Sequence, residues 1–206
     1  MRFAVLFVCT GNICRSPTAE RLLAHRLRDR LGPSMPFAVA SAGTGALVGE
    51  PIYPDAERLL IQNGVDGTGF AARDIAKPMA ESANLILAMT REHRAAVARL
   101  APRVLPKLFT LREFARTLDE NRDRWPTTSD PLARAGALLA LAQQRRGQGG
   151  PVDPSLDDVP DPYRRAPERY DEAWALIAAA VDTVVAAVAP TDAVAPRPVR
   201  RTDGAS

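Results

Sequence analysis

The stretch AVLFVCTGNICRSPTAERLLAHRL, residues 4–27, sets the expectation for the whole fold. It opens in an apolar run, residues 2–8, whose short length and β-forming residues predict a buried parallel strand. Ser16 and Pro17 then have the pattern of a helix start, with serine as the N-cap and proline in the first helical position. Leucines at helical spacing follow. A tight loop therefore joins a strand to a helix N-terminus, with a cysteine at one end and an arginine at the other.

The rest of the chain repeats this alternation of strand and helix. Further strands are predicted at 37–41, 84–89 and, from a weaker pattern, 104–109, and further helices at 54–64, 90–100, 110–118 and 170–188. The alternation predicts an α/β fold, a doubly wound parallel four-stranded sheet with helices on both faces. In such a sheet the ligand site lies beyond the carboxyl ends of the strands, where the predicted phosphate-binding loop leaves strand one.

Two segments depart from this compact pattern. Residues 119–152 contain a predicted helix and the flexible sequence GQGGP, and we expect them to form an insertion on the surface of a single domain, residues 1–189. Residues 190–206 are polar and rich in proline, and we expect a disordered tail.

Composition and charge exclude several classes of function. The 206-residue chain has a formal net charge of only +3 and no long run of basic residues, so we expect no nucleic-acid partner. No segment approaches the roughly 18 apolar residues of a membrane span, and we expect neither membrane insertion nor a signal peptide. Both cysteines, Cys9 and Cys14, lie in one loop. This placement favours thiol chemistry in the reducing cytoplasm over a disulfide framework.

The loop after the first strand has the chemistry of an oxyanion site. Its backbone N–H groups face the positive end of a helix dipole, while Gly11 and Asn12 tolerate the left-handed backbone that a tight loop needs. The planar guanidinium of Arg15 can hold two phosphate oxygens at once. These positive surroundings favour the thiolate of Cys9, a nucleophile below a bound phosphoryl group. The nucleotide-binding P-loop pattern G-x-x-x-x-G-K-[ST] is absent from the sequence.

A simpler interpretation competes with this one. A lone cysteine at the end of a buried strand is usually a small core residue, and C-x5-R occurs often by chance. The conjunction of strand, Gly-Asn loop, arginine, serine and proline favours the catalytic interpretation. Expulsion of an alkoxide or phenolate also needs a proton donor. Four aspartates lie in one proline-rich segment, and Asp161, between two prolines, is the most rigidly placed, although spacing alone does not select it.

At this point the sequence resembles the low-molecular-weight protein tyrosine phosphatases. The matching motifs are V-C-T-G-N-I-C-R-S-P-x-A-E at 8–20, S-A-G-T at 41–44, V-G-x-P at 48–51, A-R at 72–73 and D-P-Y at 161–163. The resemblance implies that Cys9 forms a phosphocysteine intermediate, that Arg15 clamps the phosphate, and that Asp161 is the general acid and then the base that activates water. It implies no metal and no cofactor.

The resemblance also assigns the other loop residues. Ser16 would donate a hydrogen bond to the thiolate, Asn12 would hold the shape of the loop, and Cys14 would be the second cysteine that pairs with the nucleophile on oxidation. The substrate-binding set is completed by Thr10, Gly11 and Ile13 in the loop, with Leu47 and Tyr163 as the walls of the pocket.

The segment ALVG around Leu47 resembles the bacterial subclass that dephosphorylates tyrosine kinases of capsule and exopolysaccharide export. We therefore expect a phosphotyrosine protein as substrate and inorganic phosphate or a similar oxyanion as a ligand of the loop. Where many relatives carry a histidine that supports the loop, this chain has Phe70. Its two histidines, His25 and His93, are expected to be plain surface residues.

Three alternatives stay open. Protein-arginine phosphatases share the loop but typically have threonine where this chain has Ile13, and the apolar side chain favours a tyrosine leaving group. Arsenate reductases of this fold need a third cysteine, and the chain has two. A non-catalytic phosphate-binding scaffold, with residues 119–152 as its working surface, would not need Cys9, Arg15 and Asp161 together.

Overall fold

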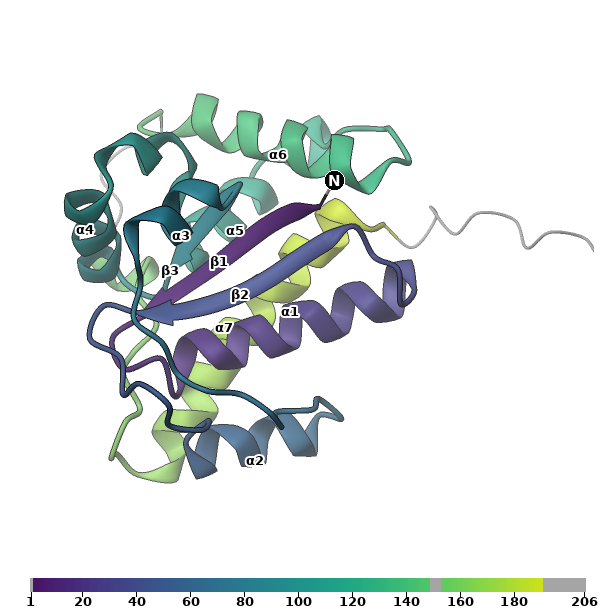
Figure 1. The fold of residues 1–206 in the computed structure, drawn as a ribbon. Coiled ribbons are helices and arrows are strands. Elements are labelled where there is room, and N and C mark those ends of the chain that lie inside the picture. The colour runs from purple at the N-terminus through teal and green to yellow at the C-terminus, as the bar shows by residue number, and fades with distance from the viewer. Residues whose placement is uncertain (1, 149–152, 191–206) are drawn as a thin grey trace, which may run out of the picture.

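The computed structural model describes residues 2–148 and 153–190 (Figure 1). Its sheet has four strands, all parallel, in the order β2-β1-β3-β4. The strands are β1 (Phe3–Cys9), β2 (Phe37–Gly43), β3 (Leu85–Ala88) and β4 (Leu108–Thr110). The predicted doubly wound parallel sheet is confirmed, and the loop after the central strand β1 leaves the sheet at its carboxyl end.

Successive side chains of β1 point to opposite faces of the sheet. Val5 and Phe7 enter the larger core, and Leu6 and Val8 enter a smaller one. The larger core is covered by α1 (Arg15–Leu31), α2 (Pro54–Gln62), α5 (Leu111–Asp119) and α7 (Pro167–Val188). The smaller core is covered by α3 (Lys77–Ser82), α4 (Arg91–Leu100) and the 3₁₀ helix η1 (Pro102–Lys107). The helices thus lie on both faces, as predicted.

Two local predictions are wrong. The fourth strand was expected over 104–109, but η1 occupies most of that range and β4 begins only at Leu108. Pro106 has no N–H to give to a sheet ladder, which disfavours a strand there. Ser16 is not the N-cap of α1, because Cys14 occupies that position and Ser16 lies inside the first turn. Its hydroxyl faces the Cys9 thiol instead.

The segment 119–152 contains the 3₁₀ turn η2 (Arg122–Arg124) and α6 (Pro131–Arg145). Asp130 caps α6 by accepting the N–H of Leu132 at 3.0 Å. One face of α6 belongs to the larger core and packs near α5 and α7 through Ala135, Leu138 and Ala142 (Figure 1). Residues 149–152 lie outside the described residues, and they contain the last three residues of the GQGGP sequence. Residues 191–206 of the predicted tail also lie outside the described residues.

Candidate active site

The loop between β1 and α1 is built around Asn12. Its backbone has φ 55°, the left-handed conformation expected of this position. Its side chain is fully buried and makes three hydrogen bonds. Nδ2 donates to Ser16 Oγ at 2.9 Å and to Ser41 Oγ at 2.8 Å, and Oδ1 accepts the N–H of Arg73 at 2.9 Å. Hydrogen bonds to three segments therefore fix the shape of the loop.

A wider network of hydrogen bonds supports the loop through Ser41 and Arg73. Ser41 Oγ donates to Glu20 Oε2 at 2.6 Å, and Arg73 Nε donates to the carbonyl of Ser41 at 2.9 Å. Phe70 itself lies under the Arg21 guanidinium, 5.7 Å from ring centroid to Cζ. Ser41 of the S-A-G-T motif and Arg73 of the A-R motif therefore support the loop. Sequence reasoning did not assign these contacts.

Cys9 lies at the floor of the loop, 2% exposed. Its Sγ is 3.0 Å from Ser16 Oγ, and the buried serine hydroxyl can donate to a thiolate. The floor is packed too closely for any side chain at Gly43, because a Cβ there would lie 2.2 Å from the carbonyl oxygen of Thr10. The Cys9 thiol is therefore held in one position by its neighbours on both sides.

Arg15 and Asp161 meet across the mouth of the loop. Arg15 Nη2 lies 2.9 Å from Asp161 Oδ2, and Nη1 donates to the carbonyl of Val159 at 3.2 Å. Arg15 is 5% exposed, and its buried Nε has no hydrogen-bond partner among the described residues. Asp161 is about half exposed, and its Oδ1 accepts the N–H of Tyr163 at 3.2 Å. The guanidinium thus keeps a donor for an oxyanion while it faces the carboxylate.

The four aspartates, which spacing alone did not distinguish, have different partners in the structure. Asp153 turns back on its own segment and accepts the N–H of Ser155 at 2.9 Å. Asp157 is buried, 2.8 Å from Arg116 Nη2, and Asp158 accepts the N–H of Arg91 at 2.7 Å. Of these four carboxylates, Asp161 is the one paired with Arg15.

His93 is not the surface residue that we expected. It is 7% exposed near the start of α4, with Nε2 2.8 Å from Thr10 Oγ1 and Nδ1 2.8 Å from Thr90 Oγ1. Burial, assisted by the positive charge of Arg15, lowers the pKa of His93 to about 4. Its neutral ring therefore supports, at Thr10, the loop between β1 and α1 (residues 9–15, here called the phosphate loop). The sequence held one signal, a Thr-x-x-His helix start directly after a predicted strand.

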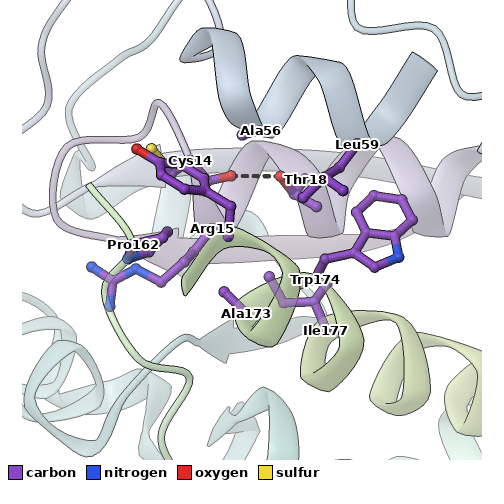
Figure 2. A pocket seen from close by; sticks show the side chains of 10 residues that line it. Cys14, Arg15, Thr18, Ala56, Leu59, Pro162, Ala173, Trp174 and Ile177 are labelled. Carbon is purple, nitrogen blue, oxygen red and sulfur yellow. Dashed lines mark hydrogen bonds between the residues drawn. The ribbon is translucent and has the colours of Figure 1, made fainter. Parts of the chain in front are cut away.

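Cys14 and Arg15 are among the residues that line a cavity of about 10 Å³, room for roughly one water. Figure 2 shows Cys14 and Arg15 at one end of this cavity and Trp174 and Ile177 at the other. Burial, followed by the nearby Cys9, raises the pKa of Cys14 to about 12. The Cys14 thiol is therefore protonated at neutral pH, and both cysteines are free in the structure.

Two of the predicted substrate-binding residues lie outside the loop but close to it. The N–H of Leu47 donates to the carbonyl of Gly11 at 3.0 Å, and its side chain is 41% exposed. Tyr163 is half-buried and packs edge-on against Tyr53, with 5.3 Å between ring centroids. Tyr53, which sequence reasoning missed, also donates its N–H to the carbonyl of the buried Ile13 at 2.8 Å.

Within residues 2–148 and 153–190 there is no group of three or more His, Cys, Asp or Glu side chains that could hold a metal ion. In the same residues, no helix is long and apolar enough to cross a membrane.

Comparison with known proteins gives a consistent picture. Residues 4–135 match the family model described as low molecular weight phosphotyrosine protein phosphatase. The low molecular weight protein-tyrosine-phosphatase Etp of Escherichia coli K12 is 36% identical over 143 residues, which cover 68% of this chain and 90% of Etp. The low molecular weight protein-tyrosine-phosphatase of Streptomyces coelicolor is 32% identical over 189 residues, which cover 91% of this chain and 94% of the relative.

Among solved structures, the tyrosine phosphatase Wzb from Escherichia coli K30 in complex with sulphate aligns with a TM-score of 0.61 and 27% identity. The alignment covers 88% of this chain and 95% of Wzb. Residues 4–135, which the family model matches, include the loop between β1 and α1, all but the first residue of the four-stranded sheet, and α1. This chain belongs to the low molecular weight phosphotyrosine protein phosphatase family.

Proposed function

We propose that this chain hydrolyses phosphotyrosine in proteins through a cysteinyl-phosphate intermediate. The observation that carries the proposal is the meeting of three side chains from distant parts of the sequence. Cys9 lies at the floor of the loop, the Arg15 guanidinium lies at its mouth, and the Asp161 carboxylate lies 2.9 Å from that guanidinium. Membership of the family supports the same activity.

In the first step the Cys9 thiolate attacks phosphorus, and the bond from phosphorus to the tyrosine oxygen breaks. Arg15 and the loop N–H groups hold the three equatorial oxygens of the phosphoryl group. Asp161, in its protonated form, transfers its proton to the leaving phenolate.

In the second step Asp161, now a carboxylate, takes a proton from a water molecule. The water attacks phosphorus, the bond from sulfur to phosphorus breaks, and the Cys9 thiolate is regenerated. The Ser16 hydroxyl, 3.0 Å from Cys9 Sγ, stabilises the thiolate as it attacks and as it leaves. Inorganic phosphate is then released from the loop. The scheme needs no metal and no cofactor.

Leu47 and Tyr163 support an aromatic substrate. Both lie beside the loop and present carbon-rich surface, Leu47 next to Gly11 and Tyr163 next to Asp161. Within phosphotyrosine proteins, the resemblance around Leu47 favours a tyrosine kinase of exopolysaccharide export as the physiological substrate. A cytoplasmic location accords with that substrate.

The test is phosphate release from phosphotyrosine and phosphoarginine peptides side by side, with EDTA and a reductant present. We expect turnover of phosphotyrosine that is lost in Cys9→Ser and falls roughly 10²–10⁴-fold in Asp161→Ala. Asp182→Ala is the matched control, because it removes an exposed aspartate of α7 that pairs with Arg26, and it should retain turnover. Preference for phosphoarginine would favour the arginine phosphatase alternative. Absence of turnover of either peptide would contradict the enzyme assignment and favour the scaffold.

A further inference from the structure

The segment that carries Asp161 has little regular structure of its own. Residues 153–163, here called the acid loop, contain only the short 3₁₀ turn η3 (Pro154–Leu156). Arg112 of α5 reaches across to this loop, and its Nη1 donates to the carbonyls of Ser155 and Asp158, both at 2.7 Å. One guanidinium therefore spans the loop and holds two of its backbone carbonyls together.

Arg116, one helical turn further along α5, makes a second contact with the acid loop. Its Nη2 lies 2.8 Å from Asp157 Oδ1, and its Nη1 donates to the carbonyl of Leu156 at 3.4 Å. Asp157 is 7% exposed, so its carboxylate relies on this arginine for its counter-charge. Residues four apart share one face of a helix, and this face of α5 is directed at the acid loop.

Besides the N–H of Arg91, which donates to Asp158, two contacts of Val159 connect the acid loop to the end of β3 and to the phosphate loop. The N–H of Val159 donates to the carbonyl of Met89, at the end of β3, at 2.8 Å. The carbonyl of Val159 accepts from Arg15 Nη1 at 3.2 Å. Asp161 follows two residues later. A displacement at Ser155–Asp158 would therefore be transmitted along a short stretch of chain to the carboxylate.

We propose that Arg112 and Arg116 are positioning residues for the general acid. They hold the acid loop from α5, and through it they keep the Asp161 carboxylate where it can protonate the leaving group. The inference rests on the proposed function and extends it to two residues outside the phosphate loop. A misplacement of about 1 Å in a reacting group can lower a rate about 10²-fold, so loss of Arg112 should reduce turnover without any contact with substrate.

The role predicts a dependence on the leaving group. A tyrosine-like phenolate is basic, with a phenol pKa of about 10, and needs the proton from Asp161. A dinitrophenolate is far less basic and leaves without it. We expect Arg112→Met to lower kcat/KM roughly 10–100-fold for phenyl phosphate and to change it less than about threefold for 2,4-dinitrophenyl phosphate. Arg116→Met should show the same pattern. Arg99→Met, an exposed arginine on α4, is the matched control and should change neither value.

A double-mutant cycle gives a second readout. In an Asp161→Ala background the carboxyl is absent, so Arg112→Met should cause no further loss on phenyl phosphate. Equal losses on both aryl phosphates, or a full additional loss in the Asp161→Ala background, would overturn the proposal. If Arg112→Met does not fold, Arg112→Lys keeps the charge but not the planar fork, and it should show a smaller loss with the same leaving-group dependence. Wild-type inactivity towards both substrates would contradict the proposed function itself, a result distinct from either of these.

Discussion

The phosphate loop and the acid loop are held in place by different kinds of contact. The phosphate loop, residues 9–15, is largely buried, and its Asn12 side chain connects it both to Ser16 in the first turn of α1 and to the distant Ser41 and Arg73. The acid loop is partly exposed, and Arg112 and Arg116 of α5 hold it from outside. The phosphate loop is thus held by a buried network centred on one of its own side chains, whereas the acid loop depends on arginines of a neighbouring helix. Changes in the two loops should have different kinetic signatures.

Among substitutions that test the difference between the two loops, we expect the largest loss of activity from a substitution of Asn12. Asn12→Ala removes three hydrogen bonds and leaves a non-glycine residue at φ 55°. Because the whole anion site is distorted, we expect kcat/KM to fall roughly 10²–10³-fold on phenyl phosphate and 2,4-dinitrophenyl phosphate alike. The free energy of unfolding should fall by about 1–3 kcal/mol, measured by urea denaturation.

Asn12→Gly is the control for this change, because it relieves the backbone conformation without restoring the hydrogen bonds. Its stability should lie between those of the wild type and Asn12→Ala, while its activity stays low. A loss confined to phenyl phosphate would contradict the distinction between the two loops, since that signature belongs to the acid loop.

The contrast also explains what the sequence could predict. The strand, the left-handed Asn12, the oxyanion loop and the following helix lie within one continuous stretch and follow from local patterns. The parallel sheet followed from the alternation of strands and helices. One of the two local failures, the strand expected over 104–109, came from reading apolar content without weighing Pro106.

Contacts between distant segments could not be predicted in this way. Nothing in the spacing of the four aspartates distinguishes Asp161 from Asp157, because the difference lies in which arginine each one meets. His93 looked like a surface residue on an amphipathic helix, and only the packing of α4 against the end of β1 brings it to Thr10. The resemblance to the family supplied Asp161, and the structure supplied its position.

A smaller effect is expected from His93, whose influence falls on stability more than on turnover. Its pKa of about 4 in the folded protein lies below the ordinary value of 6.5, so the folded state binds fewer protons than the unfolded state between these values. Stability is therefore unaffected above pH 6.5 and is lost as pH falls towards 4, by on the order of 3 kcal/mol. Burial is the main cause of the lowered His93 pKa, the positive charge of Arg15 adds to it, and the negative charge of Asp161 opposes it. Thr10 and Thr90 hydrogen-bond the two ring nitrogens.

His93→Gln removes the titrating group while keeping a side chain that can hydrogen-bond. Urea denaturation at pH values from 7 to 4 should show a shallower loss of stability in His93→Gln than in the wild type. His25→Gln is the matched control, because His25 lies on α1 and is 29% exposed, 3.2 Å from Asp29. Wild-type and His93→Gln curves that run parallel through this pH range would contradict the assigned role.

The smallest effect on catalysis is expected at the edge of the sheet remote from both loops. Arg146, directly after α6, donates to the carbonyls of Leu105 and Leu108 at 2.8 and 2.5 Å and lies over the Phe109 ring, 3.8 Å from Cζ to centroid. These contacts join the segment 119–152 to β4, the outer strand of the sheet, whose backbone groups need partners. Arg146→Ala should lower the free energy of unfolding by about 1–2 kcal/mol through lost packing and hydrogen bonds.

The same variant should leave kcat/KM on both aryl phosphates within about twofold of the wild type, because neither loop contacts Arg146 in the described residues. Arg145→Ala, which removes a neighbouring arginine paired with Gln148, is the control for stability and should cost less. A leaving-group-dependent loss of activity in Arg146→Ala would mean that segment 119–152 acts on the acid loop through α5, where Glu113 pairs with Arg146 at 3.7 Å. In that case α5 would transmit the state of one side of the molecule to the general acid on the other.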